Sequence, residues 1–371
     1  MSGQFGPDRA AIRAEAEALC AAFQEAGALR VECDLLQPAE TLLDLYGEDI
    51  RARAYVTADP LHGEMMLRPD FTVPVVQAHM AHGAEPARYC YQGEVFRKQD
   101  RPGPRPSEFL QVGFELFDRE APEIADAEVY ALFARLLAPL GLRAVTGDIG
   151  ILMAAVRGLS TTERRKAALL RHVWRPRRFR ALLDRFSGRS PTSPARMELL
   201  ERLRSNTTAD LIAQAGPMIG LRDEAEIADR AQALIEDAET PPIAAPEAAL
   251  LYDLLTLAAP ARLALQHLRG ITAMLPAIEP AVDRFAARLD ALERAGINPS
   301  DLPFEAGHGR NSMEYYDGFV FSFLAAENLP PVATGGRYDA LTAVLGQGRS
   351  IPAVGGVIRP AQVVELKEAW L

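Results

Sequence analysis

Two hydrogen-bonding side chains share one face of an alternating segment. In EFLQVGFELFD, residues 108–118, Gln111, Gly113 and Glu115 occupy every second position, and side chains two apart in a strand point to the same face. The intervening positions carry apolar side chains that can pack on helices: Leu110, Val112, Phe114 and Leu116. The polar row is therefore either an ordinary solvated face or the floor of a site for a small polar ligand.

Two other segments favour the ligand-binding interpretation. LRPDFT places Asp70 between a proline and a phenylalanine at the end of a predicted strand, and MEYYDGFVF supplies Tyr316. An acid, an amide and a phenol together suit an amino acid, because carboxylates can pair with its ammonium group and the other groups can hydrogen-bond its side chain.

A sheet must position these side chains. RYCYQGEVFRK, residues 88–98, alternates in the same way as 108–118, and the proline-rich RPGPRPS joins the two runs, so we predict a long antiparallel hairpin. An extended piece broken at Pro38 precedes a short helix. Shorter strands are expected at 53–58 and 64–70, which flank a turn, and at 143–150, 313–325, 330–336 and 352–358.

Helical patterns occupy the rest of the chain. Residues 8–26 predict an amphipathic helix that Asp8 caps and Gly27 stops, and residues 126–142 predict another that ends at Gly141. The apolar face of the second helix carries Val129, Leu132, Phe133, Leu136 and Leu137. Residues 153–297 are almost wholly helical in pattern. We therefore predict an α+β fold with a core of residues 1–152 and 298–371 and a helical insertion subdomain of residues 153–297.

Composition limits the class of protein. The 371 residues are 49% hydrophobic and 24% charged, which suits a globular protein with a sizeable core. No apolar stretch reaches the length of a membrane-spanning helix. Three cysteines without CxxC spacing indicate a reducing cytoplasm and no disulfide framework, and six scattered histidines give little support for a metal site.

The net charge of −10 argues against a protein built to bind nucleic acid. One segment, residues 163–189, is densely basic. A solvated helical face against an acidic neighbour or partner explains it better than a site for nucleic acid or phosphate.

Five linked segments resemble histidyl-tRNA synthetases in order and in approximate spacing: LRPDFTVPVVQA, YQGEVFRKQDRPGPRPSEFLQVGFELF, DAEVYAL, EYYDGFVF and GGRYDALTAVLG followed by PAVGG. The resemblance covers most of the chain outside the helical insertion and includes the class II aminoacyl-tRNA synthetase motifs. It implies a class II synthetase-like antiparallel sheet of about six strands flanked by helices. It also implies a homodimer, with Pro38 at the position of the proline that supports the dimer interface.

The histidine pocket of that family is largely kept. Asp70 replaces a glutamate and retains the charge that pairs with the ammonium group, and Arg97 matches the second-motif arginine that contacts the carboxylate or the α-phosphate. Glu115 corresponds to the acid that faces the imidazole. The histidine-binding positions that the resemblance implies are Asp70, Thr72, Arg97, Gln111, Glu115, Tyr316 and Tyr338.

The ATP side of that family is not kept. Gln99 replaces the glutamate that meets adenine, Asn311 replaces the catalytic arginine, and Gln362 replaces the arginine that clamps ATP. Arg359 replaces a glycine and is expected to point elsewhere, because Pro360 opens the following helix. Loss of one preorganised cation typically lowers a rate roughly 100- to 1000-fold, so negligible adenylation is expected.

This combination is similar to the regulatory subunits of ATP phosphoribosyltransferase. In that family the pocket is kept, while ATP chemistry and the anticodon-binding domain are lost; here the chain stops nine residues after Gln362. The resemblance implies a non-catalytic, cytoplasmic subunit for the first step of histidine biosynthesis. Its partner would be the short-form catalytic subunit, in a hetero-octamer of four plus four, with L-histidine as feedback effector and no cofactor, metal, tRNA or membrane.

Two other functions stay open at this stage. The chain could be a truncated histidine-activating ligase, against which Asn311 and Gln362 argue, and histidine-dependent ATP–pyrophosphate exchange would detect it. It could also be a scaffold that activates a partner and binds no ligand, against which the polar pocket argues. A histidine-dependent shift in thermal stability would separate a scaffold from a histidine sensor.

Overall fold

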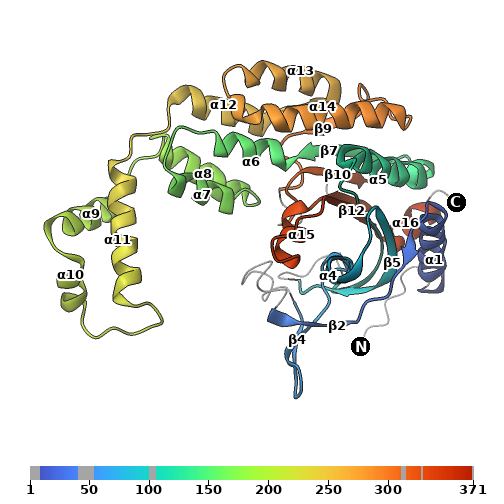
Figure 1. The fold of residues 1–371 in the computed structure, drawn as a ribbon, viewed down its shortest axis with the longest axis horizontal. Coiled ribbons are helices and arrows are strands. Elements are labelled where there is room, and N and C mark those ends of the chain that lie inside the picture. Colours follow the sequence, from blue (N-terminus) through green and yellow to red (C-terminus); the bar gives the residue numbers. More distant parts are fainter. Residues whose placement is uncertain (1–8, 41–53, 100–105, 311–314, 327–328, 370–371) are drawn as a thin grey trace.

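The computed structural model describes residues 9–40, 54–99, 106–310, 315–326 and 329–369 (Figure 1). Four expectations lie wholly or partly outside these ranges: the cap at Asp8, the short helix beyond Pro38, the first five residues of the predicted loop 101–107, and Asn311.

A nine-stranded sheet forms the centre of the molecule, in the order β1-β5-β6-β12-β11-β10-β7-β9-β8. Within the run β5-β6-β12-β11-β10-β7, every pair of neighbouring strands is antiparallel. This run is the six-stranded antiparallel centre that was expected. Short strands extend it at both edges, where β1 and β9 pair in parallel with β5 and β7. The bounds are β1 Leu29–Arg30, β5 Ala87–Phe96, β6 Glu108–Phe117, β7 Arg143–Asp148, β8 Ala258–Pro260, β9 Pro303–Glu305, β10 Phe319–Leu324, β11 Ala333–Arg337 and β12 Ala353–Ile358.

A second sheet has the order β2-β4-β3, with β2 Leu36–Pro38, β3 Val56–Asp59 and β4 Gly63–Leu67. Strands β3 and β4 correspond to the two strands predicted to flank a turn, and the structure pairs them antiparallel. Helix α4 (Thr72–His82) follows this sheet directly and carries the chain to β5.

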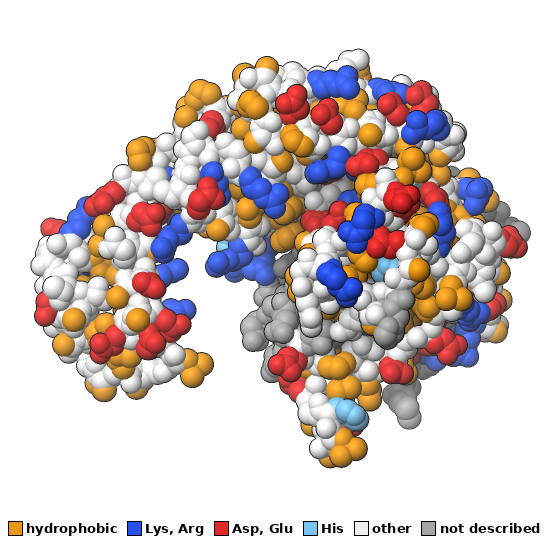
Figure 2. All heavy atoms as spheres, viewed as in Figure 1, with side chains coloured by type: hydrophobic (Ala, Val, Ile, Leu, Met, Phe, Trp, Pro, Cys, Tyr) orange, Lys and Arg blue, Asp and Glu red, His pale blue; other side chains and the backbone are white. Residues whose placement is uncertain are grey.

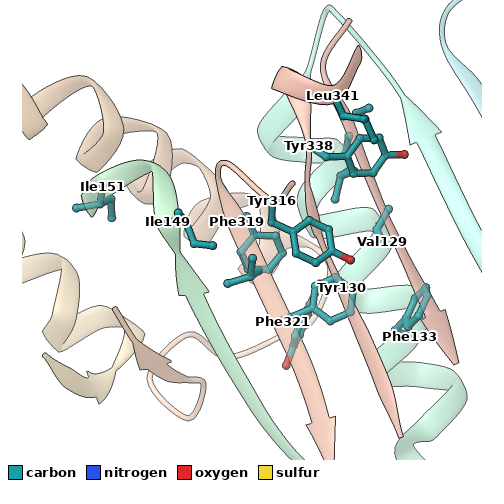
Figure 3. Close-up of a cluster of buried hydrophobic side chains, with 14 of the residues drawn as sticks. Val129, Tyr130, Phe133, Ile149, Ile151, Tyr316, Phe319, Phe321, Tyr338 and Leu341 are labelled. Carbon is teal, nitrogen blue, oxygen red and sulfur yellow. The ribbon is translucent and has the colours of Figure 1, made fainter. Parts of the chain in front are cut away.

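The apolar face of the large sheet packs on two helices. Phe23 of α1 (Arg9–Glu25) lies 5.4 Å from Phe114 of β6, measured between ring centroids, and 5.5 Å from Phe133 of α5 (Pro122–Leu137). Phe133 in turn lies 5.5 Å from Phe321 of β10 (Figure 3). The predicted alternation therefore places β6 with its apolar row against helices, and the row with Gln111 and Glu115 faces the other way.

The helix predicted at 126–142 begins earlier and ends earlier. It starts at Pro122, because proline suits the first helical turn. It ends at Leu137, and a 3₁₀ turn, η1 (Ala138–Leu140), leads to Gly141 in the left-handed conformation, with φ of 56°. Gly27, with φ of 89°, stops α1 as predicted.

A run of helices separates β7 from β9. These are α6 Ile149–Arg157, α7 Glu163–Arg171, α8 Pro176–Phe186, α9 Pro194–Ser205, α10 Thr208–Ala215, α11 Glu224–Glu239, α12 Ala245–Thr256, α13 Ala261–Thr272, the 3₁₀ turn η2 Pro276–Ile278 and α14 Glu279–Arg294. Helices α9 to α11 form an arm that projects away from the sheet, whereas α14 lies along α5 (Figure 1). The division of the chain into a core and an insertion subdomain stays a prediction.

The basic segment 163–189 lies in α7, α8 and their connections, beside the hollow next to the arm (Figure 2). Part of its charge is paired with α11, since Arg165 contacts Asp237 at 2.6 Å and Arg164 contacts Glu236 at 3.4 Å. An acidic neighbour within the chain therefore accounts for part of this basic face.

The chain returns to the sheet through β9 and ends with α15 (Asp339–Leu345), β12 and α16 (Pro360–Glu368). Pro360 opens α16, as the sequence predicted. In the part of the chain that the structure describes, no helix is long and apolar enough to span a membrane.

Candidate functional site

Glu115 is the centre of a buried polar cluster on the face of β6 that points away from α1 and α5. Its side chain is 1% exposed, and its carboxylate accepts hydrogen bonds from three hydroxyl groups. The donors are Tyr338 at 2.6 Å, Tyr91 at 2.8 Å and Thr72 at 3.0 Å. They come from the start of α15, from β5 and from the start of α4, so the fold converges on this carboxylate from three elements.

Glycines make room for the cluster. Gly355 of β12 pairs with Glu115, and a Cβ atom added there would lie 1.6 Å from Glu115 Oε2. Gly113 of β6 pairs with Tyr91, and a Cβ atom there would lie 2.2 Å from Cζ of that ring. Any larger residue at either position would collide with the groups that surround the carboxylate.

Within the part of the chain that the structure describes, Glu115 is hydrogen-bonded by hydroxyl groups alone. No arginine, lysine or histidine of the described residues forms an ion pair with it. Burial raises the pKa of Glu115 to about 7, and the negative charge of Asp70 adds to this effect, while the bonds from Tyr338, Tyr91 and Thr72 oppose it. A cationic group brought beside Glu115 would favour its ionised form.

Gln111 lies four residues before Glu115 on β6, so its side chain is on the same face of the strand. It is 0% exposed, and neither Nε2 nor Oε1 has a hydrogen-bond partner among the described residues. Buried amide groups are almost always hydrogen-bonded, so a fully unpartnered one calls for a specific explanation. A polar ligand bound at this face would supply the missing partners.

The segment before α4 contributes Asp70 and Thr72, both of which are buried. Thr72 joins the cluster through its bond to Glu115 and through Tyr315, whose hydroxyl donates to Thr72 Oγ1 at 3.3 Å. Asp70 lies close enough that its charge raises the pKa values of Glu115 and Tyr316. The structure therefore brings these two predicted positions to the same place as Glu115.

Tyr316 and Tyr338 project from neighbouring segments (Figure 3). Tyr316 is 5% exposed and lies over Gly336, where an added Cβ atom would meet its ring at 2.9 Å. Burial raises the pKa of Tyr316 above its usual range, and the charges of Glu115 and Asp70 contribute. Tyr338 is 1% exposed and bonds Glu115 directly.

Arg97 lies beside this cluster, and its Nε donates to the backbone carbonyl of Pro69 at 2.8 Å, next to Asp70. Three of the four positions at which the resemblance implies lost ATP-binding residues are hydrogen-bonded to backbone carbonyl groups. Gln99 Nε2 donates to its neighbour Arg97 at 3.1 Å, Arg359 Nη1 to Pro331 at 2.6 Å and Gln362 Nε2 to Pro330 at 3.4 Å.

Two tyrosines of the cluster were missed by the sequence analysis. Tyr91 belongs to the alternating run of β5, and its ring stacks on Phe71 at 4.4 Å. The hairpin register that pairs Tyr91 with Gly113 could have revealed it, because the gap between Gln111 and Glu115 had to be filled. Tyr315 was visible beside Tyr316, but no signal showed that its hydroxyl reaches Thr72.

The cluster can hold a small polar molecule that carries a positive charge. It offers two buried carboxyl groups, an unpartnered amide and several phenols, which suits an amino acid better than an anion. Within the described ranges, no three His, Cys, Asp or Glu side chains are grouped as a metal site requires.

Comparison with known proteins gives two kinds of relative. The family model described as histidyl-tRNA synthetase matches residues 4–259 and 226–363. The ATP phosphoribosyltransferase regulatory subunit of Allorhizobium ampelinum is 31% identical over 354 residues, which cover 92% of this chain and 94% of the relative. The corresponding protein of Brucella anthropi is 34% identical over 347 residues, with coverages of 88% and 89%.

Solved structures give the same fold. The crystal structure of an ATP phosphoribosyltransferase regulatory subunit/histidyl-tRNA synthetase from Bacillus halodurans superposes with a TM-score of 0.68, over 99% of this chain and 81% of that one. At 21% sequence identity the likeness concerns the fold alone. It agrees with the predicted class II synthetase-like α+β architecture.

Proposed function

Because the chain belongs to the family of ATP phosphoribosyltransferase regulatory subunits, we propose that it binds L-histidine at the Glu115 cluster and conveys feedback inhibition to a catalytic subunit. The subunit itself is non-catalytic in this proposal, and the glycosyl transfer takes place in its partner. The pathway is histidine biosynthesis, at its first step.

The observation that carries the proposal is an unpartnered amide, Gln111, on the same strand face as the carboxylate of Glu115. Among the described residues, Gln111 is fully buried with both polar atoms unpaired, and Glu115 has hydroxyl donors but no cation. Histidine would supply what both lack, because its ammonium and imidazole groups donate hydrogen bonds and can carry positive charge. The proposed binding residues are Asp70, Thr72, Arg97, Gln111, Glu115, Tyr316 and Tyr338.

Inhibition follows from linkage in this proposal. A ligand that binds one quaternary arrangement better than another shifts the population toward the first, and the shift is limited by the difference in affinity. The proposed assembly is a hetero-octamer with the short-form catalytic subunit, built on a homodimer through the class II-like interface, without tRNA. A cytoplasmic location stays a prediction.

Replacement of the central carboxylate tests the proposal. We expect Glu115→Gln, which keeps the shape of the side chain, to weaken histidine binding roughly 10- to 100-fold, since hydrogen bonds to charged groups contribute about 1.5–3 kcal/mol. Isothermal titration calorimetry with the purified chain and with its complex measures this. Assembly with the catalytic subunit should be unchanged in size-exclusion chromatography.

Glu128→Gln is the matched control. Glu128 pairs with Arg88 at 2.6 Å on the other side of the sheet, so this change also removes a carboxylate but leaves the Glu115 cluster intact. Normal histidine affinity is expected for the control. Equal affinities of the wild type and Glu115→Gln would remove this cluster from the mechanism.

A further inference from the structure

Two tyrosines of the candidate site come from different segments, and each is followed by an aspartate. Tyr316 and Asp317 precede β10, while Tyr338 follows β11 as the N-cap of α15 and Asp339 is the first residue of that helix. Strands β10 and β11 are antiparallel neighbours, with Val320 opposite Gly336, so the two segments meet at one end of this pair. Figure 3 shows the two tyrosine rings. Their relative position depends on the contacts between these two segments.

Asp317 joins them through three hydrogen bonds. Its backbone N–H donates to the carbonyl of Arg337 at 3.0 Å. Its carboxylate accepts from the backbone N–H of Asp339 at 3.1 Å and from that of Ala340 at 2.6 Å. Asp317 therefore binds the peptide groups on both sides of Tyr338.

These bonds differ from ordinary helix capping. Tyr338 occupies the N-cap position of α15 and provides no side-chain cap. The first N–H groups of the helix are accepted instead by Asp317, which lies 22 positions before Asp339 in the chain. Asp317 thus does for α15 what a local Ser or Asp does for other helices. It also ties that helix to the segment of Tyr316.

The position of Tyr338 matters because its hydroxyl donates to Glu115 at 2.6 Å. Its own backbone N–H donates to the carbonyl of Ala353 at 3.0 Å, so the remaining freedom of the residue is set by the two flanking peptide groups. A shift of those groups would move the phenol away from the carboxylate.

Asp317 is held in a charged surrounding. Arg337 lies on β11, and Asp339 accepts from Arg337 Nη1 at 3.0 Å and from the backbone of Ala353 at 2.9 Å. Burial raises the pKa of Asp317 to about 7, and repulsion from Asp339 adds to it, against the two backbone bonds and Arg337. Both carboxylates are only partly exposed and repel each other, and the backbone N–H groups of Asp339 and Ala340 offset that repulsion at Asp317.

We propose that Asp317 is the positioning residue of the site, which holds Tyr338 in line with Glu115 and Tyr316 so that the amino-acid ligand meets a preformed cluster. The inference rests on the proposed function for the identity of the ligand, L-histidine. The role of Asp317 in placing Tyr338 does not depend on it.

A double-mutant cycle tests the proposal. Asp317→Asn presents an N–H₂ group to one of the two backbone donors, and Tyr338→Phe removes the bond to Glu115. We expect each single variant to weaken histidine binding roughly tenfold, and the double variant to bind like Tyr338→Phe alone, because Asp317 acts through Tyr338. Additive losses in calorimetry would overturn the proposal.

A second variant removes a donor instead of the acceptor. Ala340→Pro lacks the N–H that bonds Asp317, and proline occupies the same second position of α12 and α14 in this chain. We expect a smaller loss of affinity than for Asp317→Asn, since one of the two side-chain bonds is retained. An unchanged affinity would contradict the proposal.

A ligand-free readout separates this inference from the proposed function. With 3-fluorotyrosine incorporated, the ¹⁹F resonance of Tyr338, assigned from Tyr338→Phe, should shift in Asp317→Asn. It should stay in place in Asp223→Asn, which weakens the N-cap of α11 in the arm and so matches the chemical change. An unmoved Tyr338 resonance in Asp317→Asn would refute the positioning role, whereas a moved resonance without histidine binding by the wild type would refute only the proposed function.

Discussion

Two buried carboxylates of this molecule differ in the groups that surround them. Glu115 and Asp126 are each 1% exposed. Asp126 of α5 is paired with two arginines, Arg337 at 2.8 Å and Arg288 of α14 at 3.2 Å. Glu115 is surrounded by three hydroxyl donors and has no cation among the described residues.

This difference is the one expected between a structural carboxylate and one that binds a ligand. A buried charge is stable when cations and hydrogen bonds satisfy it, and Asp126 has both from within the chain. Arg288 of α14 also pairs with Asp148 at the end of β7. The ion pairs of Arg288 therefore join α14 to both α5 and the sheet. Glu115 has hydrogen bonds but no counter-charge, and this is the state expected of a group that receives its cation from a ligand.

The largest effect on stability is expected when an arginine is removed from the buried ion pairs around Asp126. Arg288→Met should lower the free energy of unfolding by about 3–5 kcal/mol, because it leaves two buried carboxylates with one cation fewer. Urea unfolding followed by circular dichroism measures this. The control Arg262→Met removes an arginine whose partners, Asp290 and Glu293, are exposed, so a loss of about 0–1 kcal/mol is expected. Similar losses for both variants would abolish the distinction.

The unpaired carboxylate should show itself in the pH dependence of stability. Folding raises the pKa of Glu115 to about 7, so between its unfolded pKa and pH 7 the folded state binds more protons than the unfolded state. The free energy of unfolding therefore falls as pH rises through this window, by roughly 3 kcal/mol from this group.

Glu115→Gln should remove that part of the slope. Asp317 contributes in the same direction and will leave a residual slope in the variant. Denaturant unfolding at several pH values between 5 and 8 measures both proteins. Parallel curves for the two would show that Glu115 does not titrate in this range.

The smallest signal is expected in an assay for histidine activation by ATP. The purified chain should give no histidine-dependent ATP–pyrophosphate exchange above background. Gln362 and Arg359 are bonded to backbone carbonyls beside β11, and the resemblance implies that Asn311 stands in place of a catalytic arginine. An authentic histidyl-tRNA synthetase serves as positive control. Clear exchange would make the chain a histidine-activating ligase.

Much of the fold could be predicted from local patterns. Alternation predicted β5 and β6 as a hairpin and placed Gln111 and Glu115 on one face, because the strand period of two is fixed by backbone geometry. Gly27 and Pro360 marked the ends of helices for reasons of backbone conformation alone. The edge strands β1, β8 and β9 escaped prediction because two or three residues are too few to show a period.

Contacts between distant segments were the part that local patterns could not provide. Cys20 and Cys90 are far apart in the sequence, yet their sulfur atoms lie 3.7 Å apart where α1 packs on β5. Asp317 and Tyr91 were likewise passed over, since their roles depend on which peptide groups and which glycines the neighbouring strands place beside them.

The sequence by itself determined the order of the elements, the polar row on β6 and the motifs that identify the family, because these depend on residue type and spacing along one chain. The tertiary structure decided which carboxylate is neutralised and which is left without a cation. Asp126 and Glu115 cannot be told apart by their local sequence. Their difference arises because α14 and β11 bring arginines to one, while α4, β5 and α15 bring only hydroxyl groups to the other.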